Sequence, residues 1–153
     1  MQFPEINFSV LPPYSLTFIY GQRVMGKSTL IKDHVKQIVK SREIDNIYVF
    51  SKIDKEIYEE LNPSILSEFN NDHFDDIKLE QMEKIKNNSI AESIIILDEI
   101  YKNSDPLKEL IFKSRKLGLT VFIATETMYL WKPEIIARFD YCFFARVSDY
   151  NNW

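Results

Sequence analysis

The amino-acid sequence predicts an α/β fold in which a central, mainly parallel five-stranded sheet is covered by helices. Five short apolar segments carry this prediction, at residues 16–20, 46–50, 93–98, 120–125 and 141–147. Four of them are apolar at nearly every position, a pattern typical of strands buried on both faces of a parallel sheet. Helical patterns lie between the segments, and strands that alternate with helices form parallel sheets. The length of 153 residues predicts one domain, 1–153.

Helices are expected over residues 27–40, 104–118 and 132–139. The apolar residues of the first helix share one face: Leu30, Ile31, Val35, Ile38 and Val39. Ser104 or Asp105 can cap the second helix, and Pro106 suits its first turn. Gly118 suits its C-terminal end. The segment 52–88 is polar and weakly periodic, and we expect two or three short helices there.

Composition and charge limit the classes of partner. The net charge of −4 does not suggest attraction of the whole molecule to nucleic acid, so DNA contacts would need a local patch or a ring interior. No apolar run approaches the roughly 20 residues of a transmembrane helix, and the first ten residues do not resemble a secretory signal. The single cysteine, Cys142, is expected to be a small buried residue and suits a reducing compartment. We therefore expect a soluble intracellular protein with no membrane partner.

The segment GQRVMGKST, residues 21–29, matches the pattern G-x-x-x-x-G-K-[ST]. It follows a predicted strand and opens a predicted helix, as phosphate binding by this motif requires. Glycines let the backbone amides approach the α- and β-phosphates, with the positive end of the helix behind them. Lys27 can reach the β- and γ-phosphates, and Ser28 can offer its hydroxyl to Mg²⁺. The motif predicts a nucleoside triphosphate site formed by Gly21, Gln22, Arg23, Val24, Met25, Gly26, Lys27, Ser28 and Thr29.

Two acidic residues, Asp98 and Glu99, stand at the end of the apolar segment 93–98. Ligands of parallel sheets lie at the carboxyl ends of the strands, so both side chains are expected beside the phosphate loop. Asp98 would hold Mg²⁺ together with Ser28. Glu99 could polarise a water molecule for in-line attack on the γ-phosphate, which favours ATP hydrolysis. Thr125, at the end of the segment 120–125, could sense the γ-phosphate.

Arg115 and Arg138 are candidates for contact with the γ-phosphate of a neighbouring subunit. Arg115 also ends a predicted helix, where a cation stabilises the helix dipole without any catalytic role. Other chemistries lack the necessary residues: the two histidines, His34 and His73, and Cys142 have no metal-ligand spacing. His34 is expected to pack at the edge of the core.

The order of phosphate loop, intervening strand and IIILDE resembles the P-loop ATPases that have an additional strand and a catalytic glutamate. Within that group, SRKLGLTVFIATET and KPEIIARFD resemble the FtsK–HerA superfamily, and in particular the genome-packaging ATPases of large DNA viruses and virophages. Glu126 stands where that family usually has glutamine. Five residues fall near the motif positions of the packaging branch: Arg115, Thr125, Pro133, Ile136 and Arg138.

The resemblance implies a three-layer P-loop NTPase fold with the five strands in the order 5-1-4-3-2. It also implies ATP hydrolysis in a homo-oligomeric ring, such as a hexamer, that drives double-stranded DNA through its pore. Arg115 or Arg138 would complete a neighbour's site. Partners would include portal or vertex proteins of a capsid, and the protein would act in the host cytoplasm, a virus factory or the virion.

Two other readings stay open. The chain could be a stand-alone P-loop nucleotide kinase or a nucleotide-dependent switch, with the segment 52–88 supplying an acceptor pocket. It could also be a non-catalytic ATP-binding subunit, although such a subunit would need only Asp98 and not Glu99.

Overall fold

The computed structural model describes residues 11–52, 55–89, 92–100 and 104–145. Its centre is a six-stranded sheet with the strand order β3-β2-β4-β5-β1-β6, and every pair of neighbouring strands is parallel. The strands are β1 (Leu16–Tyr20), β2 (Ile47–Ser51), β3 (Ile65–Ser67), β4 (Ser93–Asp98), β5 (Leu119–Thr125) and β6 (Tyr141–Phe144).

The α/β fold class and the order of the five predicted strands are confirmed, since the sheet from β6 to β2 reads 5-1-4-3-2 in the numbering of the prediction. The prediction of five strands is one too few. The sixth strand, β3, has three half-buried residues and pairs only with β2 at the sheet edge. So short a strand within a polar segment has no periodic signal. The last predicted strand ends at Phe144, and residues 146–147 lie outside the described part.

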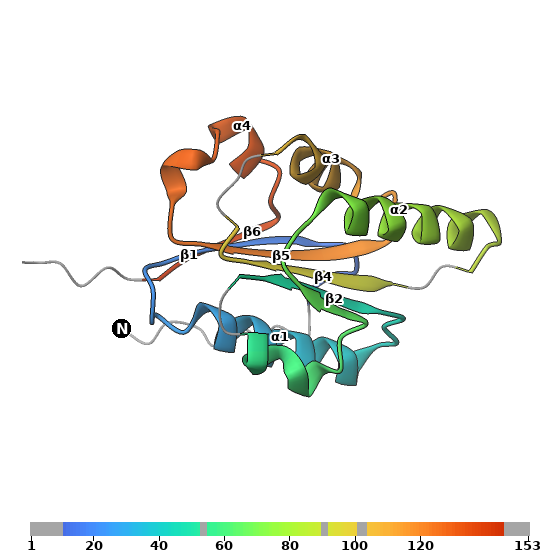
Figure 1. Cartoon of the computed structure of the whole chain (residues 1–153), viewed down its shortest axis with the longest axis horizontal. Coiled ribbons are helices and arrows are strands. Elements are labelled where there is room, and N and C mark those ends of the chain that lie inside the picture. The colour runs from blue at the N-terminus through green and yellow to red at the C-terminus, as the bar shows by residue number, and fades with distance from the viewer. Residues whose placement is uncertain (1–10, 53–54, 90–91, 101–103, 146–153) are drawn as a thin grey trace, which may run out of the picture.

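Helices cover both faces of the sheet, as Figure 1 shows. Helix α1 (Lys27–Ser41) lies on one face, with the 3-10 helix η2 (Lys55–Leu61) packed beside it. Helices α2 (Asn71–Lys86), α3 (Asp105–Lys113) and α4 (Pro133–Ile136) lie on the other face, and the short 3-10 helix η3 (Met128–Leu130) follows β5. Along β4, Ile94 and Ile96 pack toward α1, whereas Ile95 and Leu97 pack toward α2 and α3. The strands are therefore buried on both faces, as their continuous apolar character predicts.

Three local predictions are wrong. The segment 52–88 contains η2, β3 and the single 16-residue helix α2 in place of two or three short helices. Helix α3 ends at Lys113, and turns carry the chain to Gly118, which has a left-handed φ of 68°. Cys142 is exposed because β6 is an edge strand with alternating burial. Within the described part of the chain, no helix has both the length and the apolar character to span a lipid bilayer.

All strands run in the same direction, so their carboxyl ends meet at one edge of the sheet. The loop 21–26 after β1, Asp98 at the end of β4 and Thr125 at the end of β5 lie along this edge. The fold thereby brings together segments that are about a hundred residues apart in the sequence.

Candidate functional site

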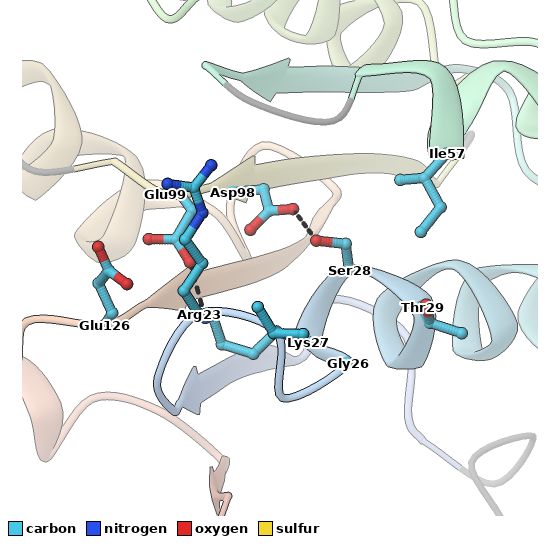
Figure 2. Close-up of a pocket in the computed structure, with 10 residues that line it drawn as sticks. Arg23, Gly26, Lys27, Ser28, Thr29, Ile57, Asp98, Glu99 and Glu126 are labelled. Atoms are coloured by element: carbon cyan, nitrogen blue, oxygen red, sulfur yellow. Dashed lines mark hydrogen bonds and ion pairs between the residues drawn. The ribbon is translucent and has the colours of Figure 1, made fainter.

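A pocket of about 230 Å³ opens at the carboxyl edge of the sheet (Figure 2). Its walls come from the loop between β1 and α1, from η2, and from the ends of β4 and β5. The lining residues are Arg23, Val24, Gly26, Lys27, Ser28, Thr29, Ile57, Asp98, Glu99 and Glu126. Six of these ten belong to the predicted phosphate loop, whereas its residues Gly21, Gln22 and Met25 do not line the pocket.

The N-terminus of α1 faces this pocket without a cap. Gly26 is its N-cap residue and supplies no side-chain cap, and the first turn contains no acidic residue. By contrast, Asn70 caps α2 by accepting from the His73 amide, and Ser104 caps α3 by accepting from the Leu107 amide. Because helix N-termini have unsatisfied amides and a partial positive charge, an uncapped one in a pocket suits an anion.

The two glycines of the motif are required for different reasons. Gly26 has a left-handed φ of 78°, and a Cβ added to it would meet no atom within 4 Å, so the space in front of it is open. A Cβ on Gly21 would lie 2.6 Å from the Cβ of Ala145, so this position has room only for glycine. Gly26 therefore shapes the loop beside the pocket, and Gly21 lets the loop pack against the end of β6. Val24, at the tip of the loop, also has a positive φ of 70° and is 96% exposed.

Lys27 lies buried at the base of the pocket, and carbonyl and carboxylate oxygens hold its ammonium group. Its Nζ donates to the carbonyl oxygens of Gly21 at 2.8 Å and of Gln22 at 3.0 Å. The same nitrogen forms an ion pair of 2.7 Å with Oε1 of Glu99. Glu99 itself has a left-handed φ of 58°, which is unusual for a residue with a side chain and typical of functional sites.

Asp98 accepts two short hydrogen bonds on a single oxygen. The Ser28 hydroxyl and the Tyr58 hydroxyl each donate to Oδ2 at 2.6 Å. The other oxygen, Oδ1, is buried and has no hydrogen-bond partner among the described residues. A hydroxyl and a carboxylate with one unsatisfied oxygen form a donor set of the kind that Mg²⁺ prefers. The residues present therefore fit a hydrated magnesium ion.

Thr125 and Glu126 differ in their relation to the pocket. Thr125 is fully buried, and its hydroxyl accepts from the Thr127 amide at 3.1 Å. Its carbonyl accepts from the Gly21 amide at 3.2 Å, so its backbone holds the start of the phosphate loop. Glu126 lines the pocket opposite α1, as Figure 2 shows.

Arg115 and Arg138 are not brought to the pocket of their own chain. Arg115 forms an ion pair with Asp140, which precedes β6 and accepts from the Leu16 amide at the start of β1. The guanidinium of Arg138 lies over the ring of Phe112, 4.7 Å from its centroid. Both arginines are exposed and lie near the amino ends of the strands, at the edge of the sheet opposite the phosphate loop.

Two residues that contribute to the site, Ile57 and Tyr58, come from η2 and escaped the sequence analysis. Ile57 lines the pocket, and Tyr58 bonds Asp98 across 40 positions of sequence. No motif marks the segment 52–88, so only the three-dimensional packing reveals them. His34, as expected, belongs to the core: it is 1% exposed, and burial lowers its pKa to about 4.

Comparison with known proteins places this geometry in context. No protein-family model matches the chain. An uncharacterized protein of Acanthamoeba polyphaga mimivirus, L666, is 29% identical over 119 residues. That match covers 71% of this chain and 47% of the mimivirus protein, so the chain spans about half the length of its relative.

Solved structures share the fold at low sequence identity. The genome packaging NTPase B204 of Sulfolobus turreted icosahedral virus 2, in complex with ATP-γS, superposes with a TM-score of 0.62 at 18% identity, covering 90% of this chain and 78% of B204. The ATPase EssC of Geobacillus thermodenitrificans gives a TM-score of 0.61 at 12% identity, covering 88% of this chain and 33% of EssC. The type VII secretion ATPase EccC of Thermomonospora curvata gives 0.58 at 19% identity, covering 81% and 18%. The resemblance stated from the sequence is confirmed at the level of the fold, and this chain has the fold shared by a viral genome-packaging NTPase and by secretion ATPases.

Proposed function

We propose that this chain is an ATP-hydrolysing DNA translocase of the FtsK–HerA type that packages double-stranded viral DNA into a capsid. The observation that carries the proposal is that one pocket brings together an uncapped helix N-terminus, Lys27 and the Asp98–Glu99 pair. The structural neighbours support it, because B204 is a genome packaging NTPase and its structure holds an ATP analogue.

The phosphate loop would bind the triphosphate of ATP. The uncapped amides of the first turn of α1 face the open space in front of Gly26, where the β-phosphate would lie. Lys27 is held at the base of the pocket by two backbone carbonyls, so its charge is already positioned for the β- and γ-phosphates. Ser28 and Asp98 would hold Mg²⁺. Magnesium held by these two residues would supply positive charge to offset the negative charge that develops on the phosphate oxygens.

Glu99 would act as the base that polarises the attacking water. In the structure its carboxylate forms an ion pair of 2.7 Å with Lys27. A bound γ-phosphate offers Lys27 a competing anion, so the ammonium would turn toward the nucleotide and release Glu99 for the water. Binding of the γ-phosphate by Lys27 and activation of water by Glu99 would thereby be coupled, because the carboxylate is released only when a triphosphate occupies the pocket.

Arg115 or Arg138 would complete the site of a neighbouring subunit in a homo-oligomeric ring. Both guanidinium groups are exposed at the edge of the sheet that is remote from the phosphate loop of their own chain. An arginine supplied from a second subunit stabilises charge on the γ-phosphate in many P-loop enzymes. A ring such as a hexamer would surround DNA and dock on portal or vertex proteins of the capsid.

One observation favours the alternative of a nucleotide kinase. A second pocket, of about 540 Å³, adjoins the first through Glu99 and is lined partly by residues 68–71 of the segment after β2. Its charged residues are Lys52, Glu68 and Glu99, so a phosphorylated acceptor would meet one cation and two carboxylates. We consider hydrolysis the better proposal because kinases bind such acceptors with clusters of arginine and lysine.

Two measurements test the proposal together. The oligomeric size is determined with and without ATP, and ATP turnover is measured with and without double-stranded DNA. A translocase is expected to assemble into rings and to hydrolyse ATP faster when DNA is present. A monomer whose ATP turnover is unchanged by DNA but rises with an added nucleotide acceptor would favour the nucleotide kinase alternative. If no assembly condition gives stimulation by DNA, the packaging function is wrong and only ATP hydrolysis remains.

A further inference from the structure

Tyr58 is the one tyrosine in the described part of the chain whose hydroxyl bonds the Asp98 carboxylate. It projects from η2 into the space between α1 and the sheet, and its side chain is 0% exposed. Its hydroxyl lies 2.6 Å from Oδ2 of Asp98, the same oxygen that accepts from Ser28 at 2.6 Å. The carboxylate is therefore fixed from both sides, by α1 and by η2.

This arrangement leaves Asp98 with two unequal oxygens. Oδ2 accepts two hydrogen bonds, whereas Oδ1 is buried without a partner among the described residues. A buried carboxylate oxygen without a partner is costly, and in a folded protein it usually marks a place for a ligand or an ion. The two hydroxyls thus orient the carboxylate and leave one oxygen for a cation or for water bound to it.

In the bond between Tyr58 and Asp98 the phenol is the donor, because a carboxylate oxygen only accepts. A buried phenol that donates to one oxygen of the carboxylate restricts its rotation, so the contribution of Tyr58 is to hold Asp98 in place.

The segment that holds Tyr58 is attached to the phosphate loop's own helix. Glu60 of η2 forms ion pairs with Lys32 and Lys36 of α1. On the other side of Tyr58, Ile57 lines the pocket itself (Figure 2). Helix η2 is therefore a wall of the site, linked both to α1 and to the end of β4.

We infer that Tyr58 is a positioning residue that holds the Asp98 carboxylate in the orientation needed for the divalent cation bound with the nucleotide. The inference rests on the proposed function, since it assigns Tyr58 a part in magnesium-dependent ATP binding. It extends the site beyond the phosphate loop and the acidic pair, to a segment with no recognisable motif.

The test compares two tyrosine-to-phenylalanine variants in the full chain. Tyr58→Phe removes only the hydroxyl that bonds Asp98. Tyr48→Phe is the matched control, because the Tyr48 hydroxyl also donates to a carboxylate, Glu80 at 3.0 Å, but lies outside the pocket. Calorimetry measures binding of a non-hydrolysable ATP analogue in EDTA and over a magnesium titration, and turnover is measured over the same titration.

We expect Tyr58→Phe to need about tenfold more Mg²⁺ for half-maximal binding and turnover, the size of effect typical of one lost hydrogen bond to a charged group. Binding in EDTA should stay unchanged, and Tyr48→Phe should behave as the wild type in every measurement. An unchanged magnesium dependence of Tyr58→Phe, or an equal loss of affinity in EDTA, would overturn the inference while the wild-type ATPase stands. A wild type that binds no magnesium nucleotide would overturn the proposed function and this inference with it.

A second comparison covers the case in which Tyr58→Phe does not fold because it leaves the buried carboxylate short of a donor. Asp98→Asn removes that charge, so Tyr58→Phe can be introduced into this background at lower cost. The double variant is expected to match Asp98→Asn in its dependence on Mg²⁺, because Tyr58 acts through the Asp98 carboxylate. A further shift in the double variant would contradict the inference.

Discussion

Replacing Glu99 by glutamine should tighten ATP binding while it abolishes turnover. Glutamine keeps the shape of the side chain but removes the charge that holds Lys27, whose Nζ lies 2.7 Å from Oε1 of Glu99. At an effective dielectric constant of 20, two unit charges at this distance attract by about 6 kcal/mol. Desolvation offsets most of that attraction, and the lysine keeps its bonds to two backbone carbonyls.

If about a quarter of this attraction opposes the movement of Lys27 toward a γ-phosphate, its removal strengthens ATP binding by about 1.4 kcal/mol, or tenfold. Turnover should fall by at least about 100-fold, because the variant lacks the carboxylate that we propose polarises the water. Affinity is measured by calorimetry with magnesium and ATP, and turnover by phosphate release.

The control for this prediction is Glu126→Gln, which removes a carboxylate from the same pocket. If both variants tighten ATP equally, the gain reflects the lower negative charge of the pocket and not the release of Lys27. The reasoning is refuted if Glu99→Gln binds ATP as weakly as the wild type, or if it retains turnover within a few fold of the wild type.

Three further predictions concern other parts of the chain. Arg115→Ala and Arg138→Ala should each change ATP affinity by no more than about twofold, but the variant of the arginine that acts on a neighbouring subunit should lower DNA-stimulated turnover by about 10³-fold. Mixing that variant with Glu99→Gln subunits should restore part of the turnover. Full activity of both arginine variants would exclude a catalytic role for either arginine. The free energy of unfolding should be flat above about pH 6.5 and fall by about 3 kcal/mol toward pH 4, because the unfolded chain takes up a proton that buried His34, with a pKa of about 4, resists. Denaturant titrations at several pH values should show this slope vanish in His34→Gln. Val24→Gly should raise the free energy of unfolding by up to about 1 kcal/mol, since it relieves a β-branched residue at a φ of 70°; a loss of stability in thermal melts would contradict that strain.

The sequence predicted the central strands well because their composition reflects burial on both faces. The bounds of β1 and β4 coincide with the apolar segments 16–20 and 93–98. Helix α2, by contrast, has only three buried residues in 16, namely Phe74, Ile77 and Gln81, and one of them is polar. So narrow a buried stripe gives little periodic signal, and the segment 52–88 was therefore predicted poorly.

The candidate site likewise contains residues that could be predicted from the sequence and residues that could not. The phosphate loop is one continuous segment, and Asp98 and Glu99 are adjacent in the sequence. Each motif could therefore be recognised before the fold was known. Tyr58 reaches Asp98 only through the packing of η2 between α1 and the sheet, over 40 positions of sequence. Contacts of this kind depend on tertiary structure, and no local pattern in one sequence encodes them.

The direction of the strands bears on where an arginine could act. Strand β1 runs from Leu16 to Tyr20, which precedes the phosphate loop. Arg115 lies near the start of this strand, because its ion-pair partner Asp140 accepts a hydrogen bond from the Leu16 amide. From Leu16 to Tyr20 the strand spans about 13 Å at the usual rise per residue, which exceeds the reach of an arginine side chain. Arg115 therefore cannot contact a phosphate bound by its own chain without a change of fold. If Arg115 contacts the nucleotide during hydrolysis, a second copy of the chain must present it. Turnover lost in Arg115→Ala and partly restored by mixing with Glu99→Gln subunits would therefore be evidence for assembly.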